Sequence, residues 1–157
     1  MKISSPAFEH GEKIPEQYTC DGVNMSPPLD ISEVPLEAKS LILIMYDPDI
    51  PPIVKERFGI KEWTHWILFN IDPSTIQIPE GLSTHTHLGN QGINTNGKAG
   101  YGGPNPPDGQ HRYAFRLYAL DKTIPMNNGA TREGIEKLMK GSIIAQAEFM
   151  GTYDKKK

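Results

Sequence analysis

The sequence predicts an all-β protein that folds as an antiparallel β-sandwich or barrel. Three observations support this prediction: four apolar runs have the composition of strands, proline- and glycine-rich turns separate them, and only one segment has the clear pattern of a helix. The chain contains 15 glycines and 14 prolines among 157 residues, which favours short elements over a helical bundle. Its length suits a single domain over residues 1–157.

The first expected strand, residues 41–46, is the unbroken apolar run LILIMY, which predicts burial on both faces. The second, WTHWILFNI at residues 63–71, and the third, HRYAFRLYAL at residues 111–120, are rich in the aromatic and branched side chains that strands favour. A fourth strand is expected at residues 142–153, where SIIAQAEFMGTY alternates over part of its length.

A helix is predicted just before the fourth strand. Thr131 is a suitable N-cap, and Ile135, Leu138 and Met139 follow at the i, i+3 and i+4 positions of one helix face. Gly141 can end the helix, because glycine readily adopts the left-handed conformation of a C-terminal cap.

Strand phase places His111 and Tyr113 on a core-facing row. Side chains at i and i+2 share a face of a strand, so these two residues continue the apolar row of Phe115 and Leu117. Arg112 points to the opposite face, where a structural salt bridge is the expected role.

The same argument applies to two other polar residues. His65 is expected to share a face with Trp63, Ile67 and Phe69, and Asp47 follows the first strand in phase with its apolar residues. Each polar group lies near the loop end of a core strand, which is where a pocket rimmed by loops would form.

Each of these residues also has a purely structural interpretation. Asp47 and Asp49 form either a binding pair or a turn in which the carboxylates accept hydrogen bonds from local amides, and the spacing alone favours the turn. His65 and His111 are either core histidines or members of a shared site. Cys20 is expected to be a small packed residue.

Two kinds of site compete on the remaining evidence. Two imidazoles beside glycine-rich turns suit a small anion, to which the hydroxyl of Tyr113 would add a donor. Alternatively, His85 and His87 form an HxH pair that could bind zinc or iron together with His65 or His111. The surrounding stretch is rich in glycine and asparagine and is more typical of a loop, so no metal and no cofactor are predicted.

Other functional classes find little support. The net charge of −3 favours neither nucleic acid nor an anionic membrane as a partner, and no apolar stretch has the length of a membrane span. The single cysteine and the absence of an apolar leader-like run fit a cytoplasmic location. Because no nucleophile elbow, P-loop or dinucleotide fingerprint is present, we expect a binding protein and not an enzyme. An acid–base enzyme that acts on a small phosphorylated substrate stays an open alternative.

Four motifs in order resemble the phosphatidylethanolamine-binding protein family, which includes the Raf kinase inhibitor proteins of animals. They are DPDIP (47–51), EWTHW (62–66), GYGGPNPPDGQHRY (100–113) and KGSIIAQAEFMGTY (140–153). The short chain is most similar to the compact bacterial and archaeal branch. The resemblance implies an antiparallel β-sandwich of a large and a small sheet with Greek-key connections and one or two short helices.

The resemblance also implies a pocket for anionic groups such as the phosphate heads of phospholipids. Carried over by motif, the pocket consists of Asp47, His65, His111 and Tyr113, with Gly103 and Pro104 as loop wall. On this basis His65 and His111 would donate to the anion, while Asp47 accepts a second N–H from an imidazole. A protein partner such as a kinase or a protease, and a homodimer, are further implications.

The segment after DPD departs from the family pattern. Ile50 stands where the family has a small residue, and PIVKERFGIK at residues 52–61 is expected to reshape one side of the pocket. The resemblance also marks the Ile50–Pro51 peptide bond as a candidate for the cis form.

Overall fold

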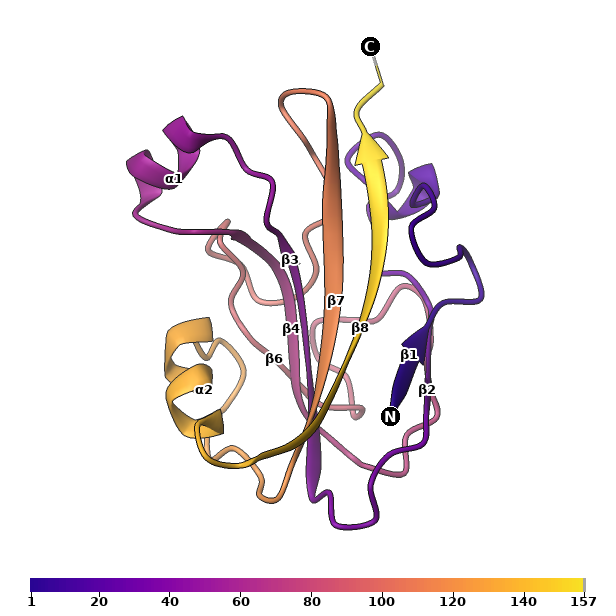
Figure 1. Cartoon of the computed structure of the whole chain (residues 1–157), viewed down its shortest axis with the longest axis vertical. Helices are drawn as coiled ribbons and strands as arrows, with labels where there is room; N and C mark the ends of the chain where they lie inside the picture. Colours follow the sequence, from indigo (N-terminus) through magenta and orange to yellow (C-terminus); the bar gives the residue numbers. More distant parts are fainter. Residues whose placement is uncertain (157) are drawn as a thin grey trace.

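The computed structural model of the protein describes residues 1–156 and has two antiparallel sheets (Figure 1). The large sheet has the order β6-β4-β3-β7-β8, and the small sheet has the order β1-β2-β5. The strands of the large sheet are β3 (Ser40–Asp47), β4 (Trp63–Ile71), β6 (Asn90–Gln91), β7 (Gln110–Leu120) and β8 (Ile143–Asp154). Those of the small sheet are β1 (Lys2–Ser4), β2 (Leu29–Ser32) and β5 (Gln77–Ile78).

The connections confirm the Greek-key prediction. In the large sheet β3, β4 and β6 are successive neighbours, and β7 then returns to pair with β3 on its other side. The four predicted strands correspond to β3, β4, β7 and β8, with ends that differ from the predicted ones by at most about one residue.

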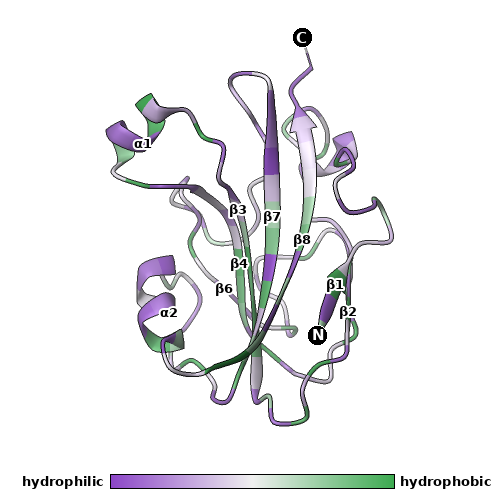
Figure 2. Cartoon of the chain, in the orientation of Figure 1, coloured by the Kyte–Doolittle hydropathy of each residue, from purple (hydrophilic) through white to green (hydrophobic). Residues whose placement is uncertain are grey.

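Strand β3 is buried along its whole length, as predicted. Leu41, Leu43 and Met45 belong to the core between the two sheets, whereas Ile42 and Ile44 belong to a second core on the outer face of the large sheet. Figure 2 shows the corresponding apolar stretches along the central strands. A strand covered on both faces needs a continuous apolar run, which explains why its sequence does not alternate.

Helix α2 (Arg132–Met139) covers the outer face of the large sheet, opposite the small sheet (Figure 1). The Thr131 hydroxyl accepts a hydrogen bond from the Gly134 N–H at 3.1 Å, and Ile135 and Met139 are buried. Gly141 has a φ of 82° just after the helix. The predicted cap, buried face and terminator are therefore confirmed.

Helix α1 (Pro52–Phe58) was not predicted as a helix and stands away from the sheet (Figure 1). Pro52 occupies its first turn, where the missing N–H costs nothing, and Gly59 ends it with a φ of 65°. A short 3₁₀ helix, η1 (Glu16–Tyr18), lies near the start of the chain. None of the helices in residues 1–156 is long and apolar enough to cross a membrane.

The prediction of a cis bond at Ile50–Pro51 is wrong, because every peptide bond in residues 1–156 is trans. With φ and ψ of −60° and 150°, Pro51 leads as an extended N-cap residue directly into α1. Ile50 is buried immediately before it.

Candidate functional site

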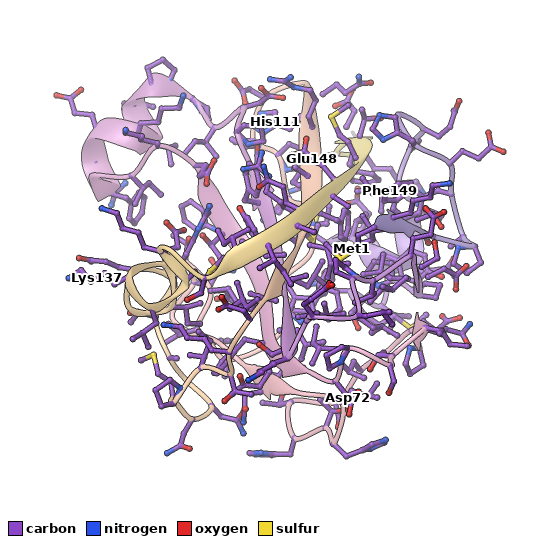
Figure 3. All side chains as sticks on the ribbon, turned by 60° about the horizontal axis from the view of Figure 1, so that its bottom comes forward. Met1, Asp72, His111, Lys137, Glu148 and Phe149 are labelled. Atoms are coloured by element: carbon purple, nitrogen blue, oxygen red, sulfur yellow. The ribbon has the colours of Figure 1, made fainter. Side chains whose placement is uncertain are left out.

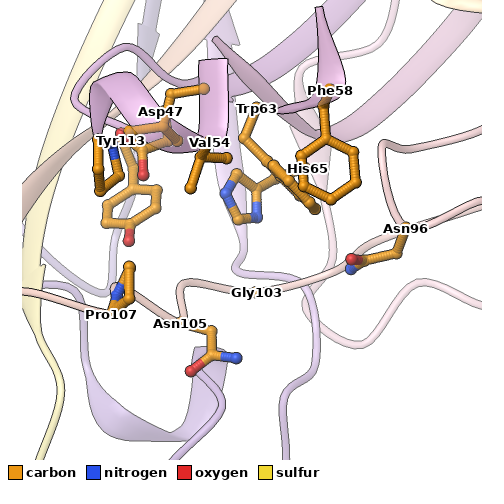
Figure 4. A pocket seen from close by; sticks show the side chains of 12 residues that line it. Asp47, Val54, Phe58, Trp63, His65, Asn96, Gly103, Asn105, Pro107 and Tyr113 are labelled. Atoms are coloured by element: carbon orange, nitrogen blue, oxygen red, sulfur yellow. The ribbon is translucent and has the colours of Figure 1, made fainter. Parts of the chain in front are cut away.

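The ends of β3, β4 and β7 that lead to or from α1 and the proline-rich loop enclose a cavity of about 330 Å³ (Figure 4). One wall is apolar and comes from α1 and its flanks: Ile50, Pro51, Val54, Phe58 and Trp63. The rest is mostly polar and comprises Asp47, His65, Asn96, Gly103, Asn105, Pro107 and Tyr113. Figure 3 shows His111, beside this cavity, at the end of the sheet opposite Asp72.

A β-bulge in β4 turns His65 into the cavity. Met45 is paired with Trp66 and Tyr46 with Thr64, so the register shifts by one residue and His65 has no partner of its own on β3. The extra residue places His65 on the side of the core between the sheets.

The predicted row of His65 with Ile67 and Phe69 is therefore wrong. Those two residues belong to the core under α2, whereas the ring of His65 meets that of Tyr113 edge-on, with centroids 5.3 Å apart. Strict alternation cannot foresee a bulge, and the phase with Trp63, which also lines the cavity, is the part of the prediction that holds.

His65 is a neutral histidine in this structure. Its Nδ1 lies 2.6 Å from the carbonyl oxygen of Gly102, and because a carbonyl only accepts, Nδ1 carries the proton. Burial lowers the pKa of His65 to about 4, against the opposing effect of the Gly102 and Gly103 backbone. At neutral pH Nε2 is then an acceptor, so His65 does not have the donor role that the sequence predicted for it.

His111 lies between two carboxylates. Asp47 Oδ2 accepts a hydrogen bond from Nδ1 at 2.6 Å, and Asp108 Oδ1 accepts one from Nε2 at 2.8 Å. Burial, the largest single effect, lowers the pKa of His111, but the two carboxylates together outweigh it and the pKa is raised. The two carboxylates thus favour the cationic form of His111.

The DPD turn combines both of its interpretations. Asp47 Oδ1 accepts a hydrogen bond from the Asp49 N–H at 2.7 Å, as in a local turn, while Oδ2 is used for His111. Burial raises the pKa of Asp47, and these two hydrogen bonds oppose that rise. Asp49 instead pairs with Arg112, at 2.8 Å, which confirms the structural salt bridge predicted for that arginine.

Tyr113 presents an unsatisfied polar group to this site. Its side chain is fully buried, and within residues 1–156 its hydroxyl has no hydrogen-bond partner. Burial raises the pKa of Tyr113, so the hydroxyl keeps its proton. A buried hydroxyl without a partner is costly and rare in native proteins. In Figure 4 it points toward Pro107 among the cavity-lining side chains.

Of the two loop residues predicted as pocket wall, Gly103 lines the cavity and Pro104 does not. Gly103 lines the cavity, and its N–H donates to Asn24 Oδ1 at 3.0 Å, so this amide is not free for a ligand. Pro104 is buried beside it and its carbonyl accepts from the Cys20 N–H at 3.0 Å, which ties the loop to the N-terminal region.

Sequence reasoning missed the apolar wall of α1 and the second carboxylate on His111. Asp108 lies three residues before His111 in a loop that the motif already contained, so its spacing was the available signal. The wall had a weaker signal, namely the apolar residues Val54 and Phe58 at i and i+4 within PIVKERFGIK.

The alternative metal site is not assembled. His85 and His87 are exposed and lie in an irregular segment, not in a strand. No group of three or more histidine, cysteine, aspartate or glutamate side chains suited to a metal ion occurs within residues 1–156.

Comparisons with known proteins identify the family of this chain. Residues 4–154 match the family described as phosphatidylethanolamine-binding protein. The chain is 48% identical over 155 residues to a UPF0098 protein of Chlamydia trachomatis, covering 99% of both chains. It is 44% identical over 156 residues to one of Methanothermobacter thermautotrophicus, covering 98% of both.

Two crystal structures show the same fold over the whole chain. CT736 of Chlamydia trachomatis, described as a putative phosphatidylethanolamine-binding protein homologue, superimposes with a TM-score of 0.90 at 47% identity, covering 99% of this chain and 97% of that one. YbcL of E. coli, described as a member of the mammalian family, gives 0.86 at 29% identity, covering 99% and 98%. The chain therefore belongs to the phosphatidylethanolamine-binding protein family.

Proposed function

We propose that this protein binds a small anionic ligand, such as a phosphate monoester or a carboxylate, in the cavity beside His111. The observation that carries the proposal is the buried, unpartnered hydroxyl of Tyr113. It lines the same cavity as Asp47 and His65, and its ring stacks on that of His111 with centroids 6.5 Å apart. An anionic oxygen in the cavity would accept the hydrogen bond that the hydroxyl now lacks.

The remaining polar groups of the cavity indicate which donors and acceptors the ligand carries. Asn96 and Asn105 can donate to further oxygens from their side-chain amides. The neutral His65 offers an acceptor at Nε2, so the proposed ligand also carries a hydroxyl or amine donor. A volume of about 330 Å³ is at the lower end of small-molecule pockets and leaves room for a substituent against the apolar wall of α1.

Replacing Tyr113 with phenylalanine tests whether its unpartnered hydroxyl binds the ligand. Calorimetric titration with phosphate or phosphoethanolamine is expected to show binding about fivefold to tenfold weaker, since one hydrogen bond contributes about 1 kcal/mol. The unliganded variant is expected to be more stable than the parent by about 1 kcal/mol in urea unfolding, because it no longer buries an unsatisfied hydroxyl.

Tyr101→Phe is the matched control for this variant. The Tyr101 hydroxyl donates to the Tyr18 carbonyl at 2.6 Å, so its removal is expected to lower stability and to leave binding unchanged. The proposal fails if Tyr113→Phe binds phosphate and phosphoethanolamine as tightly as the parent.

Binding and stability are both expected to depend on the charge of His111. The folded-state pKa of His111 is raised, so its stabilising contribution is fully present below about pH 6.5 and is lost as the pH rises through the raised value. Binding of phosphate should weaken over the same range. Urea unfolding of the parent and of His111→Gln between pH 5 and 9 checks this, and a stability difference that does not vary with pH would contradict it.

The contribution of His65 to stability depends on pH in the opposite direction. Its pKa falls to about 4 in the folded state, so its contribution is present above about pH 6.5 and is lost as the pH falls toward 4. A His65→Gln variant in the same series separates the two histidines, because its stability difference from the parent should shrink toward acid and that of His111→Gln toward alkali.

The proposal is one of binding and not of catalysis. Regulation of a partner such as a kinase or a protease belongs to the same proposal, and one observation favours a macromolecular partner: α1 exposes Ile53 and half of Phe58 beside the cavity. A homodimer and a cytoplasmic location stay predictions.

A further inference from the structure

His111 is buried, with its side chain 3% exposed, yet the carboxylate on its Nε2 belongs to an exposed residue. The Asp108 side chain is 65% exposed and comes from the proline-rich loop before β7. Pro107, the residue before it, lines the cavity, whereas His111 is not among the residues that line it. Asp108 therefore covers the Nε2 edge of the imidazole on the side of the proline-rich loop.

The two carboxylates on His111 are held very differently. Asp47 is 4% exposed, and its second oxygen is fixed by the Asp49 N–H at 2.7 Å. The Asp108 carboxylate makes no other hydrogen bond within residues 1–156, and Gly109 beside it has a φ of 63° with open space around its Cα. Of the two partners of His111, only Asp108 can leave without breaking other contacts.

The charges around His111 require that an anion binding to its imidazole replaces the Asp108 carboxylate. Asp47 from β3 and Asp108 from the loop face the imidazolium directly. Asp49 is neutralised by Arg112, and His65 is uncharged at neutral pH. With Asp108 in place there are two carboxylates for one cation, so an additional anion would meet a net negative site. An anion that takes the place of Asp108 keeps the charge balanced.

We propose that Asp108 is a specificity-determining residue: its carboxylate occupies Nε2 of His111, so that only an anion stronger than a tethered carboxylate displaces it. This inference rests on the proposed function. A group tethered a few residues away competes at an effective concentration of at least the millimolar range. Acetate offers the same chemistry as Asp108 without that advantage, so of the two ligand classes proposed above, simple carboxylates are disfavoured. A phosphate dianion carries more charge and has further oxygens that could accept from the unpartnered Tyr113 hydroxyl, so it is the anion expected to displace Asp108.

The test compares phosphate and acetate on Asp108→Ala and on the parent, by calorimetry at pH 7.5, where inorganic phosphate is mostly the dianion. Phosphate affinity is expected to rise about threefold to tenfold in the variant, because the competing carboxylate is gone. Acetate affinity is expected to rise by a larger factor, so that the preference for phosphate shrinks. Asp121→Asn is the control, since it removes one exposed carboxylate just beyond the other end of β7 and should change neither affinity.

The pKa of His111, measured by NMR titration of its imidazole, provides a second readout. Asp108→Ala is expected to lower this pKa, whereas Asp121→Asn leaves it unchanged. The inference is overturned if the parent binds phosphate but Asp108→Ala shows the same phosphate-to-acetate preference and the same His111 pKa. If neither the parent nor any variant binds phosphate, the proposed function itself fails, and this inference fails with it.

Discussion

Replacing Asp47 with alanine is expected to lower the free energy of unfolding by about 3–5 kcal/mol at pH 6. The variant removes the buried partner of His111 and leaves the imidazole with only the exposed Asp108 carboxylate, and removing one side of a buried pair is among the most destabilising changes in a protein interior. Both side chains are almost completely buried, at 4% and 3% exposure, so water cannot replace the lost carboxylate. The Asp49 N–H loses its acceptor at the same time.

Urea unfolding of two further variants provides the comparison for the loss of stability in Asp47→Ala. Asp47→Asn keeps an acceptor oxygen without the charge and should cost less than Asp47→Ala. Asp49→Ala breaks the exposed pair with Arg112, whose side chains are 28% and 56% exposed, and exposed pairs contribute up to about 1 kcal/mol. If Asp47→Ala and Asp49→Ala cost the same, the Asp47–His111 pair does not stabilise the fold in the way we describe.

Gly103→Ala is expected to cost about 2–3 kcal/mol of stability and to remove most of the binding. A Cβ on Gly103 would collide with the backbone carbonyl of Tyr18 and with the side chain of Asn24. A backbone carbonyl cannot rotate away as a flexible side chain can, so the loop itself must move, at a cost typical of overpacking. That movement carries the wall of the cavity with it.

Gly109 is the matched control in the same loop. A Cβ there meets nothing within 4 Å, so Gly109→Ala has only the cost of a left-handed φ of 63°. We expect it to lose about 1 kcal/mol or less of stability and to retain phosphate binding. Thermal unfolding and calorimetry of the two variants compare them directly, and equal losses would contradict the close contact at Gly103.

The sequence was most informative where a strand obeys simple alternation. Along β7 the period of two placed His111 and Tyr113 on the core row and Arg112 on the opposite face, and the structure agrees and supplies Asp49 as the partner of that arginine. Along β4 the same argument failed at His65, because a bulge adds a residue that no local sequence signal marks.

The candidate site, too, was predictable only in part. Three of its polar members, Asp47, His65 and Tyr113, line one cavity as expected, and His111 lies against it. The hydrogen-bond roles of the two histidines were not predicted, because they depend on which groups the fold brings against each ring nitrogen. The Gly102 carbonyl makes His65 an acceptor at Nε2, and in His111 both ring nitrogens already face carboxylates, so neither is free to donate to an anion.

The complete burial of β3 has a consequence for how this pocket can change over evolution. Asp47 is the last residue of a strand packed on both faces, so the floor of the site is preorganised and shares the rigidity of the whole domain. The α1 segment and the proline-rich loop add walls that bury few side chains of their own. Related chains can therefore acquire new ligands by exchanging these walls while the floor, and with it most of the folding energy, stays the same.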